Sequence, residues 1–157
     1  ERYFDNLKYE NLTAYRFQPL LKPEAGNIFE TLCTYSFMVG LEVAENAVEV
    51  LTRLNEQHEI YFATAGHPNT MGARHAWLKQ HFPFYKSDML IACADKRLLD
   101  VDILVDDCLE HFGQGARYQG IVYDAPYNQL CDDGNFIRVK SFPEIERAIN
   151  MYERKIA

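Results

Sequence analysis

From about residue 45 onward, short apolar runs alternate with segments whose apolar residues recur at helical spacing. Four of the short runs are typical of strands: residues 59–63, 89–92 and 102–105, and the run that begins at Gly120. Three longer segments place their apolar residues on one helical face: residues 45–57, 67–82 and 141–155. Helices that alternate with strands predict an α/β, Rossmann-like core with a mainly parallel sheet and helices on both faces.

The expected helices carry start and stop signals. Asn46 stands at the N-cap position of the first helix, and Pro83 ends the second. Ser141 is the expected N-cap of the last helix, with Pro143 in its first turn and Glu144 as the reciprocal capping partner. The short segment 108–112 reads as a brief helix ended by Gly113, and CDDGN at 131–135 is a turn signal.

The first 43 residues follow a different pattern. They are rich in aromatic residues and contain no convincing period-2 strand, whereas PEAGNIFETLC, from Pro23, has a helix-compatible proline and helical apolar spacing. We therefore predict a small helical cap over residues 1–44 and an α/β core over residues 45–157. Each aromatic residue of the cap is most simply a core residue, although a cluster of them on a cap could stack on a base.

Composition narrows the function classes. A chain of 157 residues with 48% apolar and 25% charged residues is typical of one soluble globular domain. The net charge of -7, without a basic run, argues against binding to nucleic-acid polymers or anionic membranes. No apolar run reaches the length of a membrane span, and no signal peptide is visible at Glu1. The four cysteines lack CxxC or Cys/His spacing, which favours reduced thiols in a cytoplasmic protein.

Three of the expected strands are each followed by a group that phosphate chemistry uses. Thr64 follows the first strand, Lys96 follows the second, and the pair Asp106 and Asp107 follows the third. Because the carboxyl ends of parallel strands meet at one edge of a sheet, we expect these groups to converge there. A hydroxyl and an ammonium would meet the phosphate, and a divalent cation would connect it to the carboxylates.

Taken singly, these signals differ in strength. A threonine before a helix is usually a structural cap, and a lone lysine in a loop is usually solvated. The Asp106–Asp107 pair is the strongest signal, because adjacent carboxylates repel each other unless a cation or solvent separates them. The simplest alternative is that the pair is only a solvated strand end.

The order of these groups carries a family resemblance. Phosphorelay receiver domains use similar groups but place the acidic pair first, whereas the order Thr64, Lys96, Asp106–Asp107 resembles motifs two to four of the haloacid dehalogenase superfamily. Within it, VEVLTRLNEQHEIYFATAG, ARHAWLKQHFPFY, ADKRLLDVDILVDD and GIVYDAPYNQ resemble the 5'(3')-deoxyribonucleotidase family. The resemblance covers residues 45–157 well, and residues 1–43 resemble the cap of that family only loosely.

The resemblance implies a role for each group. Thr64 and the amides of Ala65 and Gly66 would hold the phosphate, and Lys96 would neutralise it and position an attacking carboxylate. Asp107 would bind Mg²⁺, and Asp106 would support the metal shell. The implied reaction is hydrolysis of a small (deoxy)nucleoside monophosphate through an aspartyl-phosphate, with cap aromatics facing the base or sugar. The preferred nucleotide, the acceptance of 3' esters and a homodimeric state remain open.

One motif that this reaction requires is missing from the sequence. The superfamily uses a nucleophilic Asp and, two residues later, a general-acid Asp after a first strand. Asp100-Val-Asp102 has that spacing but precedes its apolar run. The missing strand would lie at the sheet centre, between the strands that end in Thr64 and Asp106. A preceding segment or another chain would supply it, or the protein is a relative that binds phosphate or nucleotide without turnover. Without the nucleophile we expect no phosphomonoesterase activity.

Overall fold

The computed structural model describes residues 30, 32–113, 117–131, 134 and 136–156. Most of the expected helix from Pro23 and most of the expected cap over residues 1–44 therefore lie outside the described residues. The same holds for most of the CDDGN turn, of which Cys131 and Gly134 are described.

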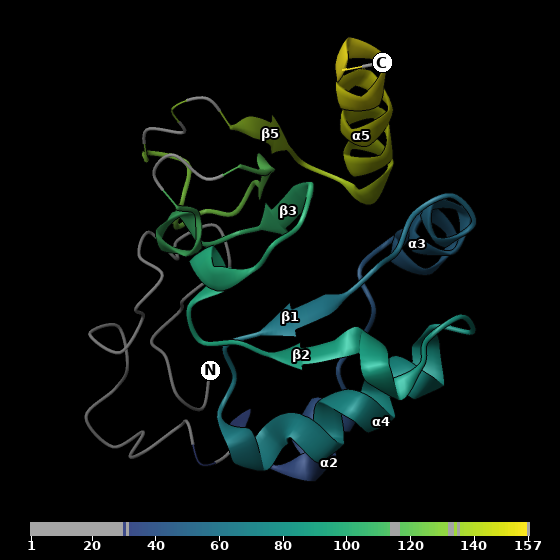
Figure 1. Cartoon of the computed structure of the whole chain (residues 1–157). Coiled ribbons are helices and arrows are strands. Elements are labelled where there is room, and N and C mark those ends of the chain that lie inside the picture. The colour runs from purple at the N-terminus through teal and green to yellow at the C-terminus, as the bar shows by residue number, and fades with distance from the viewer. Residues whose placement is uncertain (1–29, 31, 114–116, 132–133, 135, 157) are drawn as a thin grey trace.

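The described strands form two parallel sheets (Figure 1). In the first sheet β1 (Phe62–Thr64) pairs with β2 (Leu90–Ala92). In the second, β4 (Gln119–Tyr123) lies between β3 (Ile103–Asp106) and β5 (Ile137–Val139). Every pairing is parallel, as the alternation of helices and strands predicted, so the α/β fold class is confirmed.

The two sheets separate between β1 and β3, which do not pair with each other. A cavity of about 1200 Å³ lies there, and residues of both strands line it together with apolar residues of two helices. This is the position at which the sequence led us to expect a missing central strand.

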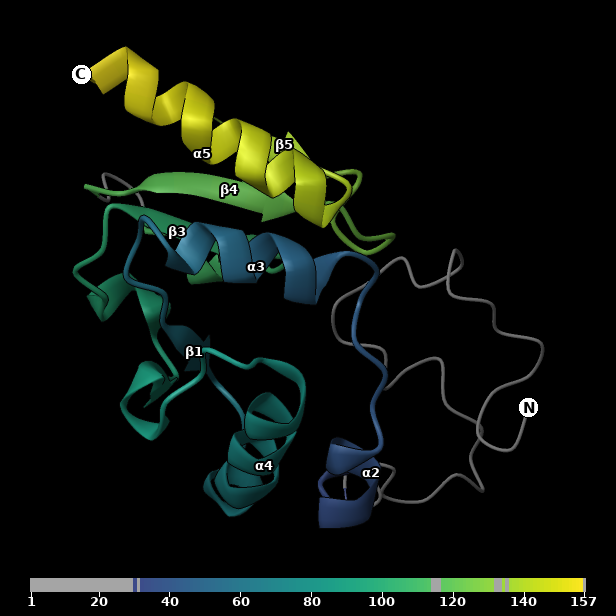
Figure 2. The ribbon, with the colours of Figure 1, turned by 90° about the vertical axis from the view of Figure 1, so that its right-hand side faces the viewer.

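Helices α3 (Ala47–Asn55) and α5 (Phe142–Ile156) lie side by side over one face of the second sheet (Figure 2). Their apolar faces form the main core with the sheet, and its buried members are Val50, Leu54, Ile121, Val139, Ile145, Ala148 and Ile149. Outside this core, Arg53 of α3 donates two hydrogen bonds, of 2.9 and 2.8 Å, to the carboxylate of Glu146 on α5. The bidentate pair fixes the two helices relative to each other.

The opposite face of the second sheet is covered by the 3-10 helix η7 (Leu109–His111) and the loops beside it. Leu104 and Val122 pack there against Phe112 and Tyr118, and the ring of Phe136 lies 4.6 Å from that of Phe112. Gly120 of β4 lies under these rings, because a Cβ at that position would lie 2.4 Å from the Phe136 ring.

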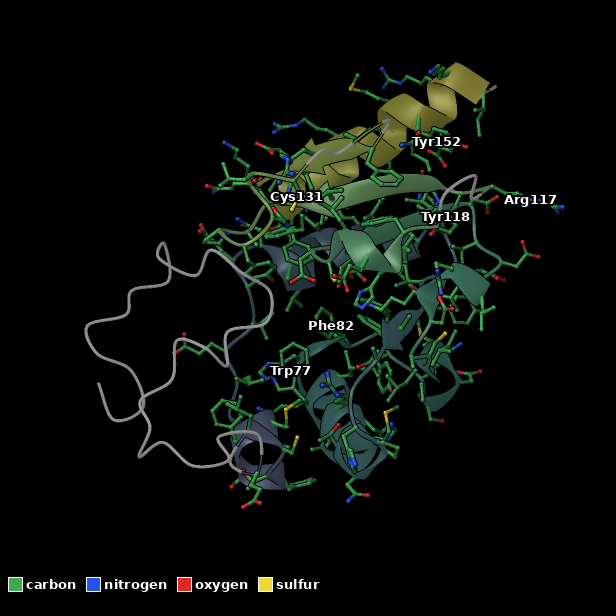
Figure 3. All side chains as sticks on the ribbon, turned by 90° about the vertical axis from the view of Figure 1, so that its left-hand side faces the viewer. Trp77, Phe82, Arg117, Tyr118, Cys131 and Tyr152 are labelled. Atoms are coloured by element: carbon green, nitrogen blue, oxygen red, sulfur yellow. The ribbon has the colours of Figure 1, made fainter. Side chains whose placement is uncertain are left out.

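Helices α4 (Met71–His81) and α2 (Tyr35–Val39) lie together on the side of the first sheet (Figures 1 and 3). The ring of Phe82, which follows α4, lies 5.4 Å from that of Phe62 in β1. Trp77 of α4 donates a 2.7 Å hydrogen bond from Nε1 to the carbonyl of Leu41. Three further 3-10 helices are η4 (Pro68–Thr70), η5 (Ser87–Met89) and η6 (Lys96–Leu98).

The three long helices are confirmed, and the differences lie at their ends and in short elements. Asn46 is the N-cap residue of α3, as expected, but its φ of 61° is left-handed and its side chain makes no capping hydrogen bond. The Glu144 carboxylate accepts a 2.7 Å bond from the amide of Lys140, one residue before the expected N-cap. Segment 108–112 contains a 3-10 turn, and β5 has no counterpart among the expected strands.

Within the described part of the chain, every helix is too short or too polar to span a bilayer.

Two glycines provide a test of the packing. Gly120→Ala should lower the free energy of unfolding by about 1–3 kcal/mol, because its methyl group would push into the Phe136 ring. Gly72→Ala is the matched control: Gly72 lies on an exposed face of α4 with no atom within 4 Å, so alanine should stabilise the protein by about 0.5–1 kcal/mol. Urea unfolding measures both. Equal effects would contradict the packing around Gly120.

Candidate functional site

The predicted residues come from three elements that end at one side of the cavity. Thr64 is the last residue of β1, Lys96 opens η6 after β2, and Asp107 follows β3 directly. Thr64, Ala65, Gly66, Lys96 and Asp107 all line the same cavity. The topology thus brings the hydroxyl, the ammonium and one carboxylate together, as the shared edge of parallel strands requires.

Asp106, the last residue of β3, is paired with Lys96 in the interior. The Lys96 ammonium donates to Asp106 Oδ2, and only 2% of the Asp106 side chain and 12% of the Lys96 side chain are exposed. Asp106 Oδ1 accepts a 2.9 Å bond from the amide of Cys108 and lies 3.0 Å from Nδ1 of His111. Burial favours the neutral acid, but the bonds from Lys96, Cys108 and His111 outweigh it and lower the pKa of Asp106.

This arrangement gives Asp106 a structural task in addition to the expected one. Both of its oxygens already have protein partners, so the carboxylate orients Lys96 and fixes the direction of the ammonium. His111, which lies on η7 and lines the cavity, was not singled out from the sequence. A histidine five residues after Asp106 is not a known sequence motif. The path of the short η7 segment brings the His111 ring back to Asp106.

The loop after β1 is ordered by its own polar groups. The hydroxyl oxygen of Thr64 accepts a 3.2 Å hydrogen bond from the amide of Gly66. His67 caps η4 by accepting from the amide of Asn69, and the Thr70 hydroxyl donates a 2.7 Å bond to the carbonyl of His67. The chain therefore turns directly after Thr64 and presents residues 64–66 to the cavity.

Asp107 points into the cavity and is held by the loop that follows β4. The hydroxyl of Tyr127 donates to Asp107 Oδ2, and the side-chain amide of Asn128 donates a 2.8 Å bond to the Asp107 carbonyl. Asn128 also bonds the carbonyl of Tyr123 and the amide of Ala125, so this buried side chain has all its main groups satisfied. The segment GIVYDAPYNQ indicated this loop in advance but did not indicate these contacts.

The oxygen ligands at the cavity are suited in part to a divalent cation. Mg²⁺ is usually bound by one or two carboxylates, with water and substrate phosphate completing an octahedron. Asp107 supplies one such carboxylate at the cavity, but the described residues bring together no group of three His, Cys, Asp or Glu side chains. The site therefore fits a cation that is shared between Asp107, a phosphate and further oxygen ligands.

Comparison with known proteins identifies the family of this site. Residues 1–156 match the family described as 5' nucleotidase, deoxy (pyrimidine), cytosolic type C protein. The chain belongs to this family. Its fold is haloacid dehalogenase-like, as the resemblance of the sequence predicted. The family is one of phosphomonoesterases that generally use a divalent metal.

Three relatives illustrate the extent of the similarity. The 5'(3')-deoxyribonucleotidase of Bacillus subtilis strain 168 is 30% identical over 125 residues, which cover 78% of this chain and 70% of the relative. A putative 5'(3')-deoxyribonucleotidase of Staphylococcus epidermidis RP62A is 29% identical over 154 residues, covering 95% and 83%. That of Staphylococcus aureus Mu50 is 30% identical over 145 residues, covering 90% and 78%. The similarity therefore extends through most of each chain.

The buried pair makes a strong prediction for stability. Asp106→Asn should lower the free energy of unfolding at neutral pH by about 3–5 kcal/mol, because it leaves the Lys96 ammonium buried without a counter-charge. Glu49→Gln removes the exposed partner of Arg53 and should lower it far less, because solvent screens an exposed pair. Urea unfolding of both variants is the measurement. Equal losses would contradict the importance of the buried pair.

The lowered pKa of Asp106 predicts a pH dependence with a definite sign. The unfolded state binds a proton at an Asp pKa of about 3.9, above the folded-state value, so folding gains stability above that pH. This contribution should be lost as the pH falls from about 4 through the folded-state pKa. Unfolding between pH 7 and pH 2 should show a component that is present in the wild type and absent from Asp106→Asn. Parallel profiles would contradict the assignment.

Proposed function

We propose that this protein is a Mg²⁺-dependent phosphomonoesterase that hydrolyses (deoxy)nucleoside monophosphates through an aspartyl-phosphate. The observation that carries the proposal is the convergence of Thr64, Lys96 and Asp107 from three elements on one cavity. Membership in the nucleotidase family, and relatives named 5'(3')-deoxyribonucleotidase, support the choice of substrate. The scattered cysteines support a reducing, cytoplasmic setting.

The residues of the chain would act first on the phosphate. The Thr64 hydroxyl and the amides of Ala65 and Gly66 would donate to phosphate oxygens, with the Gly66 amide exchanging its present bond to Thr64. Lys96, held in place by Asp106, would offset the charge that develops during transfer. Mg²⁺, when bound by Asp107, would supply further neutralisation of the phosphate oxygens. In this scheme Asp106 acts through Lys96 and through the metal shell.

The attacking aspartate would come from a strand between β1 and β3. An extended segment parallel to both would end at the edge where Thr64 and Asp106 lie, so a residue just beyond it would face the phosphate. Asp100 and Asp102 do not meet this requirement. Both precede β3 and therefore lie at the opposite end of that strand from Asp106.

Substrate choice would lie on the cap side. Most cap aromatics fall outside the described residues, but Tyr35 and Phe37 of α2 are exposed there. Trp77 of α4, the helix that packs on α2, donates a hydrogen bond to the carbonyl of Leu41 and lines the cavity. The Trp77 ring at the cavity wall and the exposed rings of α2 are suited to stacking on a base or covering a sugar. We therefore assign nucleoside recognition to this side and phosphate recognition to the strand ends.

One observation favours a second function, binding without turnover: β1 and β3 leave a space that no described strand fills. A relative without the nucleophile would bind phosphate or nucleotide and would not turn it over. The phosphate-binding residues would be the same in both cases, so binding alone cannot separate the two functions.

Release of inorganic phosphate separates them. It would be measured with Mg²⁺ on a panel of 5'- and 3'-monophosphates, with the 157-residue chain and with a version extended ahead of Glu1 by an apolar strand that ends in Asp-x-Asp. We expect release only from the extended version. We also expect its Asp107→Asn variant to require much higher Mg²⁺, because one metal ligand is lost. If neither version releases phosphate but both still bind nucleotide, the result would favour the non-catalytic relative.

A further inference from the structure

Arg74 reaches the phosphate-binding loop from helix α4. Its guanidinium lies against Gly66: a Cβ at Gly66 would lie 2.6 Å from both Nε and Nη2 of Arg74. Only a glycine allows this approach without displacing the arginine. The guanidinium thus lies beside the loop whose first residue is Thr64, and Arg74 lines the same cavity as Lys96 and Asp107.

A hydrogen bond to Thr70 fixes the position of the Arg74 guanidinium. Arg74 Nε donates a 3.2 Å hydrogen bond to the hydroxyl of Thr70, which is 1% exposed and donates in turn to the carbonyl of His67. Within the described part of the chain, no acceptor for the Arg74 Nη groups and no carboxylate partner for its charge is present. The Arg74 side chain is half-buried, so its remaining donors are held in place at a cavity wall.

The charges around the cavity indicate a role for Arg74 in binding an anion. The charge of Lys96 is largely offset by Asp106, and Asp107 adds a negative charge at the cavity. A phosphate monoester brings about two negative charges at neutral pH. Lys96 and the neutral donors of residues 64–66 therefore do not balance such a ligand by themselves. Arg74 supplies a positive charge that no carboxylate of the described residues neutralises.

We propose that Arg74 is a phosphate-binding residue that holds two oxygens of the substrate phosphate with its Nη donors. This inference rests on the proposed function, because the ligand is the same phosphate group. The planar fork of a guanidinium matches two oxygens of one phosphate, whereas an ammonium acts as a point charge. A terminal phosphate offers three free oxygens, so two can bind the Arg74 fork while the third remains for Lys96 and residues 64–66, whereas a diester offers only two.

The test is calorimetric titration of the full chain with inorganic phosphate in the presence of Mg²⁺. Arg74→Met should weaken phosphate binding about tenfold to hundredfold, because a charge-assisted pair of hydrogen bonds is lost. Arg74→Lys should fall between the wild type and Arg74→Met, since it restores charge without the fork. Lys79→Met is the matched control, because Lys79 is an exposed cation on the same helix and does not line the cavity.

The outcomes separate this inference from the proposed function. Phosphate binding that is equal in the wild type and Arg74→Met overturns the role of Arg74 and leaves the proposed site intact. No phosphate binding by the wild type overturns the proposed phosphate site, and the inference with it. Equal losses in Lys79→Met and Arg74→Met would show a general charge effect and also overturn the inference. Should Arg74→Met fail to fold, Arg74→Lys decides, with unchanged affinity counting against the proposal.

Discussion

The ion pair between Lys96 and Asp106 is the interaction on which both the fold and the site depend. Lys96 follows β2 in the first sheet and Asp106 ends β3 in the second, so the pair bridges two sheets that share no hydrogen-bonded ladder. Burying two charges is unfavourable unless their remaining groups are also satisfied. The amide of Cys108 and the ring of His111 meet that requirement at Asp106. The Lys96 ammonium at the cavity is thus held by the same ion pair that connects the two sheets.

The neighbouring carboxylates at the end of β3 have different tasks because successive residues of a strand point to opposite sides. Asp106 turns inward to Lys96, and Asp107 turns to the cavity and to the hydroxyl of Tyr127. Two adjacent carboxylates repel each other unless a cation or solvent separates them. In the structure the ammonium of Lys96 balances one of them, so the pair is accounted for without a metal between them. The metal-binding role that we propose for Asp107 therefore rests on its position in the cavity.

The periodic parts of the sequence predicted the fold well. The spacing of apolar residues predicts long helices such as α3 and α5. The strand ends could be located because the apolar runs stop at polar residues. Strand β5 was missed because Arg138 interrupts its apolar run, whereas β1 and β2, which are equally short, continue uninterrupted apolar runs. At the site, Thr64, Lys96 and the acidic pair were predictable since parallel strands end at one edge. His111, Tyr127 and Arg74 were not, because their positions depend on loop paths and on a glycine that admits a guanidinium.

The space between β1 and β3 links stability to chemistry. Among the described residues, β1 and β3 each have one paired edge, and the other edge of each strand faces the cavity. The cavity walls include Leu54 and Ile145, whose apolar faces would be covered by an inserted strand. Such a strand would satisfy both edges, bury these walls and connect the sheets that the Lys96–Asp106 pair now bridges. Its end would lie beside Thr64 and Asp107, so completing the sheet and completing the phosphate site would be one event.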